Sequence, residues 1–181
     1  MKFQESIFWA HSSSFVLRIL DSIIYITESL FHPSRDMYNI LIETAKNIPF
    51  FMGFLSIVLL QEKHLILFYV GGFIANEVIN RVLKPILQDP RPVPISPTNI
   101  YGMPSGHSQL AVYSLVFITL VLREKHYAII LLFSVLTVAT MAQRVITKVH
   151  SLEQVIVGGL LGGVLGYIFH GLSKKIGKKG I

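Results

Sequence analysis

Cationic and imidazole side chains occur in three short stretches of this chain, each at the edge of an apolar run. In chain order they are Lys84 with Arg91 and Pro92, then Pro104-Ser105-Gly106-His107, then Arg144 with His150. Because hydrocarbon disfavours such side chains, we expect them to gather in polar loops between membrane helices. Together the three stretches predict a site that handles a phosphate group.

The first stretch supplies two cations, Lys84 and Arg91. If this segment is helical, both share one face; Pro85 and Pro90 instead favour a helix that kinks or ends, followed by an extended loop. Arginine offers phosphate a planar fork and lysine a compact charge, so either form can aim both at one anion. Taken alone, the pair is explained more simply by snorkelling at the membrane interface.

The second stretch leads into an apolar run and predicts the N-terminus of a helix, which can bind an anion. Gly106 permits backbone amides to converge on a phosphate, and Ser105 adds a hydroxyl. His107 would lie beside the bound group, where it could protonate a departing oxygen. Ordinary N-capping by Ser105 is the alternative explanation of this stretch.

The third stretch places Arg144 at the end of one apolar run and His150 just before the next. A helix beginning there brings His150 close to Gln154, whose amide could hold one ring nitrogen while the other attacks phosphorus. The run from Ser151 to Gln154 also fits a capping box, in which the glutamine returns to the Ser151 backbone. Both roles of Gln154 stay open.

Several kinds of chemistry find no support in the composition. The chain has no cysteine, and it shows neither paired carboxylates nor a His-x-x-x-His spacing, so we expect no metal and no cofactor. The other histidines are expected at interfaces or in packing. The net charge of +6 reflects short loops and a lysine-rich tail, which suit topology and lipid headgroups rather than nucleic acid.

The distribution of apolar residues predicts an all-α, multi-pass transmembrane bundle. Of 181 residues, 52% are hydrophobic and 14% charged, and the apolar ones are bunched. Five spans are expected, at Thr44–Leu60, Leu65–Asn80, His107–Leu122, His126–Ala142 and Val155–His170. A further helix at Ser14–Phe31 carries three charged residues, so it either crosses the membrane or lies at its interface.

This interpretation divides the chain into residues 1–44, an N-terminal helical segment in or on the membrane, a membrane domain at 45–171 that carries the three motifs and so the predicted site, and a basic tail at 172–181. With the three site cations set aside, the positive-inside rule favours a cytoplasmic tail. The motifs then lie on the opposite face, lumenal or external. Glycines of the last span, from Gly158 to Gly166, allow close helix packing within one chain or between the protomers of a homo-oligomer.

The three motifs resemble the signature of the type 2 phosphatidic acid phosphatase superfamily. This resemblance implies a six-helix membrane bundle that acts on a lipid phosphate or diphosphate. It implies His150 as nucleophile and His107 as general acid, with a phosphate cradle formed by Lys84, Arg91, Ser105, Gly106 and Arg144. The chain departs from the usual pattern at Gln143, where serine is common, and at Gln154, where aspartate is common.

Further residues narrow the resemblance to the dolichyldiphosphatase branch. They are Asn76-Glu77-x-x-Asn80, Gln88-Asp89-Pro90-Arg91-Pro92, Tyr101-Gly102-Met103-Pro104 and His107-Ser108-Gln109, together with Gln154; Gly106 departs from that branch. The implied reaction is hydrolysis of dolichyl diphosphate to the monophosphate, in the endoplasmic reticulum membrane of a eukaryote or the plasma membrane of a bacterium. A broader lipid phosphate phosphatase, a glucose-6-phosphatase-like enzyme and a non-catalytic lipid-binding scaffold are the alternatives.

Overall fold

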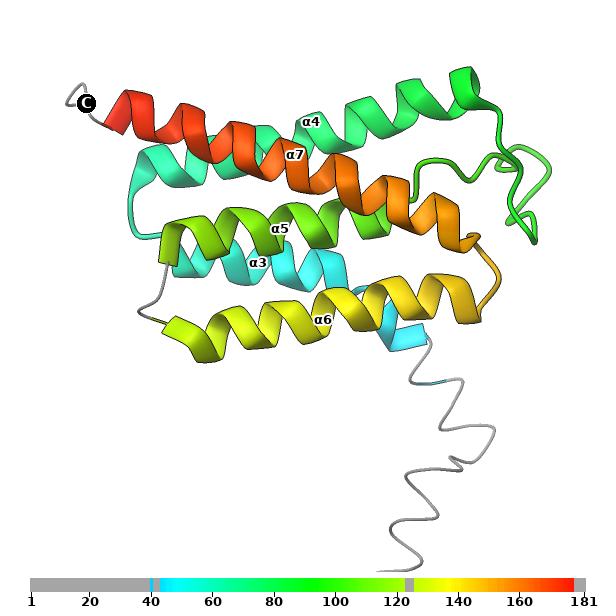
Figure 1. The fold of residues 1–181 in the computed structure, drawn as a ribbon, viewed down its shortest axis with the longest axis horizontal. Helices are drawn as coiled ribbons and strands as arrows, with labels where there is room; N and C mark the ends of the chain where they lie inside the picture. Colours follow the sequence, from blue (N-terminus) through cyan, green and yellow to red (C-terminus); the bar gives the residue numbers. More distant parts are fainter. Residues whose placement is uncertain (1–39, 41–42, 123–125, 178–181) are drawn as a thin grey trace, which may run out of the picture. The chain divides into compact units, whose positions relative to one another are not determined.

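The computed structural model describes residues 40, 43–122 and 126–177. Within them the chain forms α3 (Ile48–Leu59), α4 (Lys63–Leu87), α5 (Gly106–Leu122), α6 (Tyr127–Ile146) and α7 (Leu152–Gly177), shown in Figure 1. Apart from an isolated bridge between Pro90 and Tyr101, this part of the chain contains no β-structure. The all-α prediction is confirmed for these residues, and the helix expected at Ser14–Phe31 lies outside them.

Three of these helices, α4, α6 and α7, are long and apolar enough to cross a membrane. They correspond to the spans expected at Leu65–Asn80, His126–Ala142 and Val155–His170. The helices α3 and α5 are apolar but have 12 and 17 residues, fewer than the roughly 20 that a bilayer core requires of an untilted helix. The count of five spans therefore stays a prediction.

Polar and apolar side chains are distributed as a lipid-facing bundle requires. Large apolar side chains stand exposed along the outer faces of the helices, among them Leu67, Ile74 and Val78 of α4, Leu131 and Val135 of α6, and Leu160 and Val164 of α7. Buried positions within the helices include Asn76, Asn80, Gln109, Ser114, Thr137 and Thr140. Such a surface is unfavourable in water and suits contact with lipid.

Three helices extend beyond the expected spans, among them α6, which runs on to Ile146. The helix α4 continues to Leu87 with Pro85 inside it and ends at Gln88, which has a left-handed φ of 49°. Lys84 is thus helical whereas Arg91 lies in the following loop, so the two cations do not share a helix face. The helix α7 continues to Gly177, so residues 172–177 of the expected tail are helical.

The order of the helices brings the three motifs to one end of the bundle. In Figure 1, α4 and α6 end on the right, where α5 and α7 begin. The loop of residues 88–105 joins α4 to α5 at that end, and a short turn joins α6 to α7 there. Alternation of helix direction therefore gathers stretches that are far apart in the sequence.

Glycines of α7 let this helix approach the backbone of α5. A Cβ atom at Gly158 would overlap the Ser105 carbonyl oxygen, and one at Gly162 would overlap that of Gln109. A Cβ at Gly166 would lie 3.0 Å from the Tyr113 carbonyl oxygen. These glycines serve packing within one chain, as one of the two alternatives predicted; association of protomers through this span stays a prediction.

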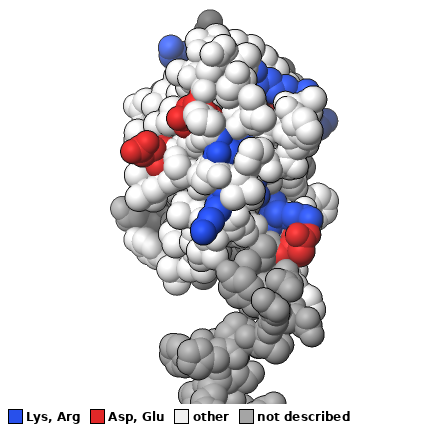
Figure 2. Space-filling view, turned by 90° about the vertical axis from the view of Figure 1, so that its right-hand side faces the viewer, with Lys and Arg blue, Asp and Glu red and all other residues white. Residues whose placement is uncertain are grey.

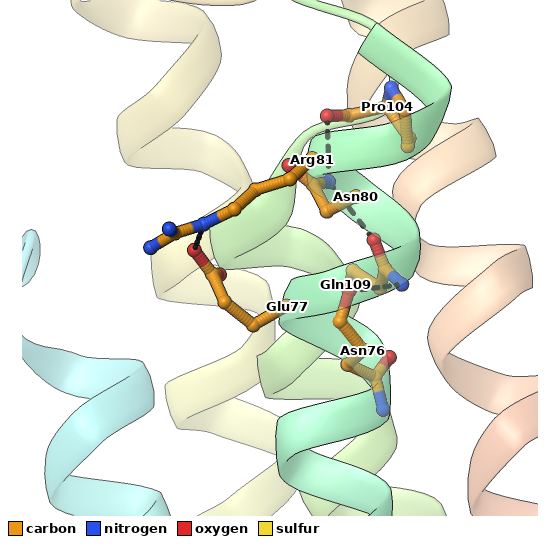
Figure 3. Close-up of polar contacts among 6 residues, drawn as sticks. All are labelled: Asn76, Glu77, Asn80, Arg81, Pro104 and Gln109. Atoms are coloured by element: carbon orange, nitrogen blue, oxygen red, sulfur yellow. Dashed lines mark hydrogen bonds and ion pairs between the residues drawn. The ribbon is translucent and has the colours of Figure 1, made fainter.

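Buried amides join α4 to α5, as Figure 3 shows. Asn80 Nδ2 donates to Gln109 Oε1 at 2.9 Å and to the Pro104 carbonyl oxygen at 3.0 Å. Gln109 Nε2 donates in turn to the Asn76 carbonyl oxygen at 3.2 Å. Because a buried amide without partners is costly, these bonds hold the entry of α5 at one position along α4.

Substitution of Gly162 by alanine tests the packing of α7 on α5. We expect Gly162→Ala to lower the free energy of unfolding by about 1–3 kcal/mol, because the added methyl group forces the two helices apart. Gly171→Ala is the matched control, since a Cβ there meets nothing within 4 Å and alanine favours a helix. Thermal unfolding in detergent measures both, and equal stability of the two variants would contradict this packing.

Candidate active site

Most of the predicted site residues line one cavity at the end of the bundle where the motifs meet. The cavity has a volume of about 440 Å³, and its lining includes Lys84, Arg91, Gly106, His107, Arg144 and His150. Figure 2 looks onto this end, where Lys and Arg side chains show among uncharged ones, with some Asp or Glu side chains nearer the edges. The structure thus brings cations and both predicted catalytic imidazoles to one cavity.

Arg91 is held in place by three acceptors at the cavity wall. Its Nη1 donates to the Val149 carbonyl oxygen at 3.0 Å and contacts His150 Nε2 at 2.8 Å, while Nη2 donates to Asn99 Oδ1 at 3.2 Å. The backbone N–H of Arg91 bonds to the Ile100 carbonyl oxygen at 2.8 Å, which folds the loop back on itself. The side chain is 7% exposed although it is charged.

The second motif enters α5 with Ser105 turned away from the cavity. The backbone N–H of Ser105 bonds to the Gln154 carbonyl oxygen at 3.0 Å, and its hydroxyl accepts a bond from the Ser108 hydroxyl at 3.0 Å. Ser105 is fully buried and does not line the cavity. Gly106 does, and beside it His107 is half-buried with its ring 6.1 Å from that of Phe50.

His150 follows a tight turn after α6 and is 2% exposed. Because a guanidinium can only donate, the bond from Arg91 Nη1 requires an unprotonated Nε2 on His150. The ring proton therefore lies on Nδ1, which donates to Gln154 Oε1 at 3.0 Å. This geometry presents Nε2, the nitrogen with a lone pair, at the cavity.

Gln154 makes the contacts of both alternatives left open by the sequence. Its Oε1 accepts the His150 bond and also a bond from the Ser151 backbone N–H at 3.2 Å, while the Gln154 backbone N–H donates to the Ser151 hydroxyl at 3.3 Å. The capping box and the histidine contact thus coexist. Gln154 is 1% exposed and lies behind the cavity.

Burial and positive charge keep His150 neutral. Desolvation, followed by the charges of Arg91 and Arg144, lowers the pKa of His150 to about 3. Burial also lowers the pKa of Arg91, but a guanidinium remains protonated at neutral pH. The site therefore pairs an uncharged imidazole with fixed cations, which suits nucleophilic attack on an anionic group.

Several residues of the site were missed as functional candidates. Gly102 is needed because a Cβ there would overlap the Gln154 side chain, and Asp89 Oδ2 accepts a bond from Gln154 Nε2 at 2.6 Å. Phe50, Asn99 and Arg81 line the cavity. The sequence singles out Asp89 and Gly102 only through their resemblance to a branch of the family, and nothing in their spacing points to Gln154.

The comparisons with known proteins agree with these motifs. Residues 65–178 match the sequence pattern of the PAP2 superfamily. The chain belongs to this superfamily. The family prediction is confirmed, while the roles of individual site residues in PAP2 chemistry stay predictions. Among the described residues no group of three His, Asp or Glu side chains could hold a metal ion.

Proteins similar to this chain include dolichyldiphosphatase 1 of Homo sapiens, 29% identical over 153 residues, which cover 74% of this chain and 64% of the relative. This chain thus spans less than two thirds of that protein. Lipid phosphate phosphatase gamma of Arabidopsis thaliana is 28% identical over 127 residues, 63% of this chain and 56% of the relative.

A solved PAP2 structure shares the fold. The phosphatidylglycerolphosphate phosphatase of Bacillus subtilis superposes with a TM-score of 0.55 and 21% identity, over 87% of this chain and 95% of that one. At this identity the likeness concerns the fold alone. It supports the arrangement of helices described above.

The lowered pKa of His150 predicts a pH-dependent stability. Because the pKa in the folded state, about 3, lies below the usual value of about 6.5, protonation favours the unfolded chain. We therefore expect neutral His150 to contribute fully to the free energy of unfolding above about pH 6.5. Below that pH the free energy of unfolding should fall by about 1.4 kcal/mol per pH unit.

Thermal unfolding of wild type and His150→Gln between about pH 8 and pH 5 measures this pH-dependent contribution of His150 to stability, since the variant lacks the imidazole. The melting temperature of the variant should fall less on acidification than that of wild type. His126→Gln is the control, because His126 is exposed at the opposite end of the bundle. Parallel curves for wild type and His150→Gln would contradict a buried neutral imidazole.

Proposed function

We propose that this chain is an integral membrane phosphatase that hydrolyses a polyprenyl diphosphate, in particular dolichyl diphosphate, to the monophosphate and inorganic phosphate. The observation that carries the proposal is the cavity in which His150 Nε2 faces Arg91 while Lys84, Arg144 and His107 share the lining. These are the groups needed to bind a phosphoryl group, attack it and protonate what departs. Such a reaction recycles a glycan carrier lipid.

The cations of the cavity suit an anion of high charge. Among the described residues, the buried Nε atoms of Arg91 and Arg144 have no hydrogen-bond partner. A buried donor without an acceptor is costly, and phosphate oxygens would satisfy both. Arg81 also lies in the lining, but its charge is offset by Glu77, which lines the cavity too and pairs with Arg81 at 2.8 Å. The three remaining cations suit a group of high negative charge, such as a diphosphate.

In the proposed first step, a terminal phosphoryl oxygen takes over the Arg91 donor that now holds His150 Nε2. The freed lone pair attacks phosphorus in line, and an N–P bond forms as the bond to the bridging oxygen breaks. Lys84, Arg91 and Arg144 neutralise the charge that spreads over the phosphoryl oxygens. Gln154 holds the Nδ1 proton, so the ring stays oriented throughout.

The leaving group is the lipid monophosphate, whose departing oxygen takes a proton from His107. That imidazole lines the same cavity at the start of α5. In the second step a water molecule gives a proton back to His107 and attacks phosphorus, which breaks the N–P bond and releases inorganic phosphate. His107 therefore acts first as general acid and then as general base.

The names of similar proteins support the choice of substrate. Beside the human protein, a dolichyldiphosphatase of Saccharomyces cerevisiae is 31% identical over 124 residues, 59% of this chain and 52% of the relative. The Arabidopsis relative, named a lipid phosphate phosphatase, supports a second candidate, a broader activity on phosphatidic acid and isoprenoid phosphates. A sugar phosphatase and a non-catalytic scaffold remain alternatives that a substrate panel separates.

The proposed orientation places the cavity on the face of the membrane opposite the basic C-terminal end. Lys174 and Lys175 lie in the last turn of α7, at the far end of the bundle from the motifs. In a eukaryote this means a lumenal site in the endoplasmic reticulum membrane, and in a bacterium an external site in the plasma membrane.

Phosphate release by the purified protein tests the function. Dolichyl diphosphate, farnesyl diphosphate, phosphatidic acid and glucose 6-phosphate are compared in EDTA, which should not reduce the rate because the proposed steps require no metal. We expect the diphosphates to react fastest and His150→Ala to lower kcat by roughly a thousandfold or more. His126→Ala, which removes an exposed histidine at the other end of the bundle, should retain wild-type rates.

Other outcomes of this substrate panel would support one of the alternative functions. A preference for phosphatidic acid would support the broader lipid phosphatase, and a preference for the sugar phosphate would support the glucose-6-phosphatase-like alternative. If no substrate released phosphate, or if the release did not depend on His150, the enzymatic function would be overturned and the scaffold favoured.

A further inference from the structure

The carboxylate of Asp89 lies behind His150, the proposed nucleophile, and is separated from it by the Gln154 side chain. Asp89 Oδ2 accepts a hydrogen bond from Gln154 Nε2 at 2.6 Å, and Gln154 Oε1 accepts one from His150 Nδ1 at 3.0 Å. The three side chains thus form a continuous series from the loop after α4, through the first turn of α7, to the cavity. Asp89 does not itself line the cavity.

The surroundings of Gln154 allow only one orientation of its amide. Its two N–H donors are used by Asp89 Oδ2 and by the Pro90 carbonyl oxygen at 2.8 Å, neither of which can donate when Asp89 is ionised. Its oxygen faces the Ser151 N–H as well as His150. A flipped amide would set oxygen against two acceptors and N–H groups against a donor.

The orientation of the amide and the Arg91 bond both favour the same tautomer of His150, and once a phosphoryl oxygen takes over the Arg91 donor the amide alone favours it. With Oε1 toward the ring, Nδ1 must carry the proton and Nε2 keeps its lone pair. With the amide reversed, an N–H would point at Nδ1, and the ring proton would move to Nε2, the nitrogen that has to attack. A carboxylate acceptor on the far side of Gln154 is therefore linked to the nucleophilicity of His150.

The negative charge of Asp89 also favours attack by His150. When Nε2 bonds to phosphorus while Nδ1 stays protonated, the ring becomes cationic. A carboxylate bonded to the amide N–H polarises the amide and increases the negative charge on Oε1, which faces that cation. The Asp89 carboxylate acts on the His150 ring only through the neutral Gln154 amide. The free imidazole can therefore stay neutral before attack, and the cationic ring formed by attack is still stabilised.

We propose that Asp89 is a positioning residue, which acts through Gln154 to hold His150 in the Nδ1-protonated form and to stabilise the cationic ring formed on phosphorylation. This inference rests on the proposed function of His150 as nucleophile. It also accounts for the neutral residue at position 154, because the carboxylate is supplied by the loop after α4 rather than by α7. Gly102 belongs to the same arrangement, since only its missing side chain leaves room for the Gln154 amide.

Exchange of the charged and neutral partners tests the proposal, with farnesyl diphosphate as substrate. Asp89→Asn keeps an acceptor of the same shape but removes the charge, and we expect kcat to fall about tenfold to a hundredfold with KM nearly unchanged. Gln154→Glu places two carboxylates together and should lower kcat at least as much. The double variant restores one carboxylate and one amide in reversed order.

We expect the double variant Asp89→Asn with Gln154→Glu to be faster than either single variant. The amide introduced at position 89 can donate to the carboxylate introduced at position 154, and that carboxylate can accept from His150. Purely structural roles would give losses that add. Glu153→Gln is the matched control, since this exposed carboxylate beside Gln154 should be dispensable for kcat. A kcat of Asp89→Asn within about twofold of wild type, or additive losses, would overturn the proposal.

A second readout does not depend on turnover. In full-length protein with 15N-labelled histidine, assigned with His150→Ala, the ring nitrogens of His150 should report the Nδ1-protonated tautomer in wild type. In Asp89→Ala, which removes the acceptor but leaves the backbone bond from Gly102 to the Asp89 carbonyl oxygen, that tautomer should lose population. An unchanged spectrum would refute the linkage, even if the wild-type protein hydrolysed none of the substrates.

Discussion

The close approach of α7 to α5 is the constraint on which the rest of the structure depends. Because Gly158 and Gly162 carry no side chain, α7 meets the backbone of α5 directly, which gains van der Waals contact where lipid offers no hydrophobic force between helices. The approach sets the start of α5 against the start of α7, where the Ser105 N–H bonds to the Gln154 carbonyl oxygen. Two of the three motifs are thereby fixed relative to each other.

The remaining motif is fixed by hydrogen bonds rather than by close packing. Most residues of the loop after α4 are exposed at the end of the bundle, but its buried groups bond to residues of the site. Arg91 bonds to Val149 and His150, and Asp89 and Pro90 accept from Gln154. The hydrogen bonds that satisfy these buried donors are therefore the same bonds that hold the candidate active site together. A displaced loop would leave the buried Gln154 amide without its two acceptors.

The electrostatics of the cavity follow from this arrangement. Three cations from different segments are forced together around one uncharged imidazole, a grouping that disfavours the cationic form of His150 and favours an anionic ligand. Membership of the PAP2 superfamily is consistent with such a cavity. This chain holds the His150 imidazole through an amide instead of a carboxylate directly, with Asp89 behind it.

The sequence by itself determined the helical class, the places of the long helices along the chain and most of the residues that meet at the cavity, because membrane helices follow apolar run length and charged groups are confined to their ends. It did not predict that Ser105 turns away from the cavity, that α4 continues past Pro85 to Leu87, or that Asp89 reaches Gln154. Those depend on which donors and acceptors remain unpaired once the helices have packed. Only the tertiary structure could decide them, since Asp89 and Gln154 are far apart in the chain and are joined through the approach of helices, not through any local pattern.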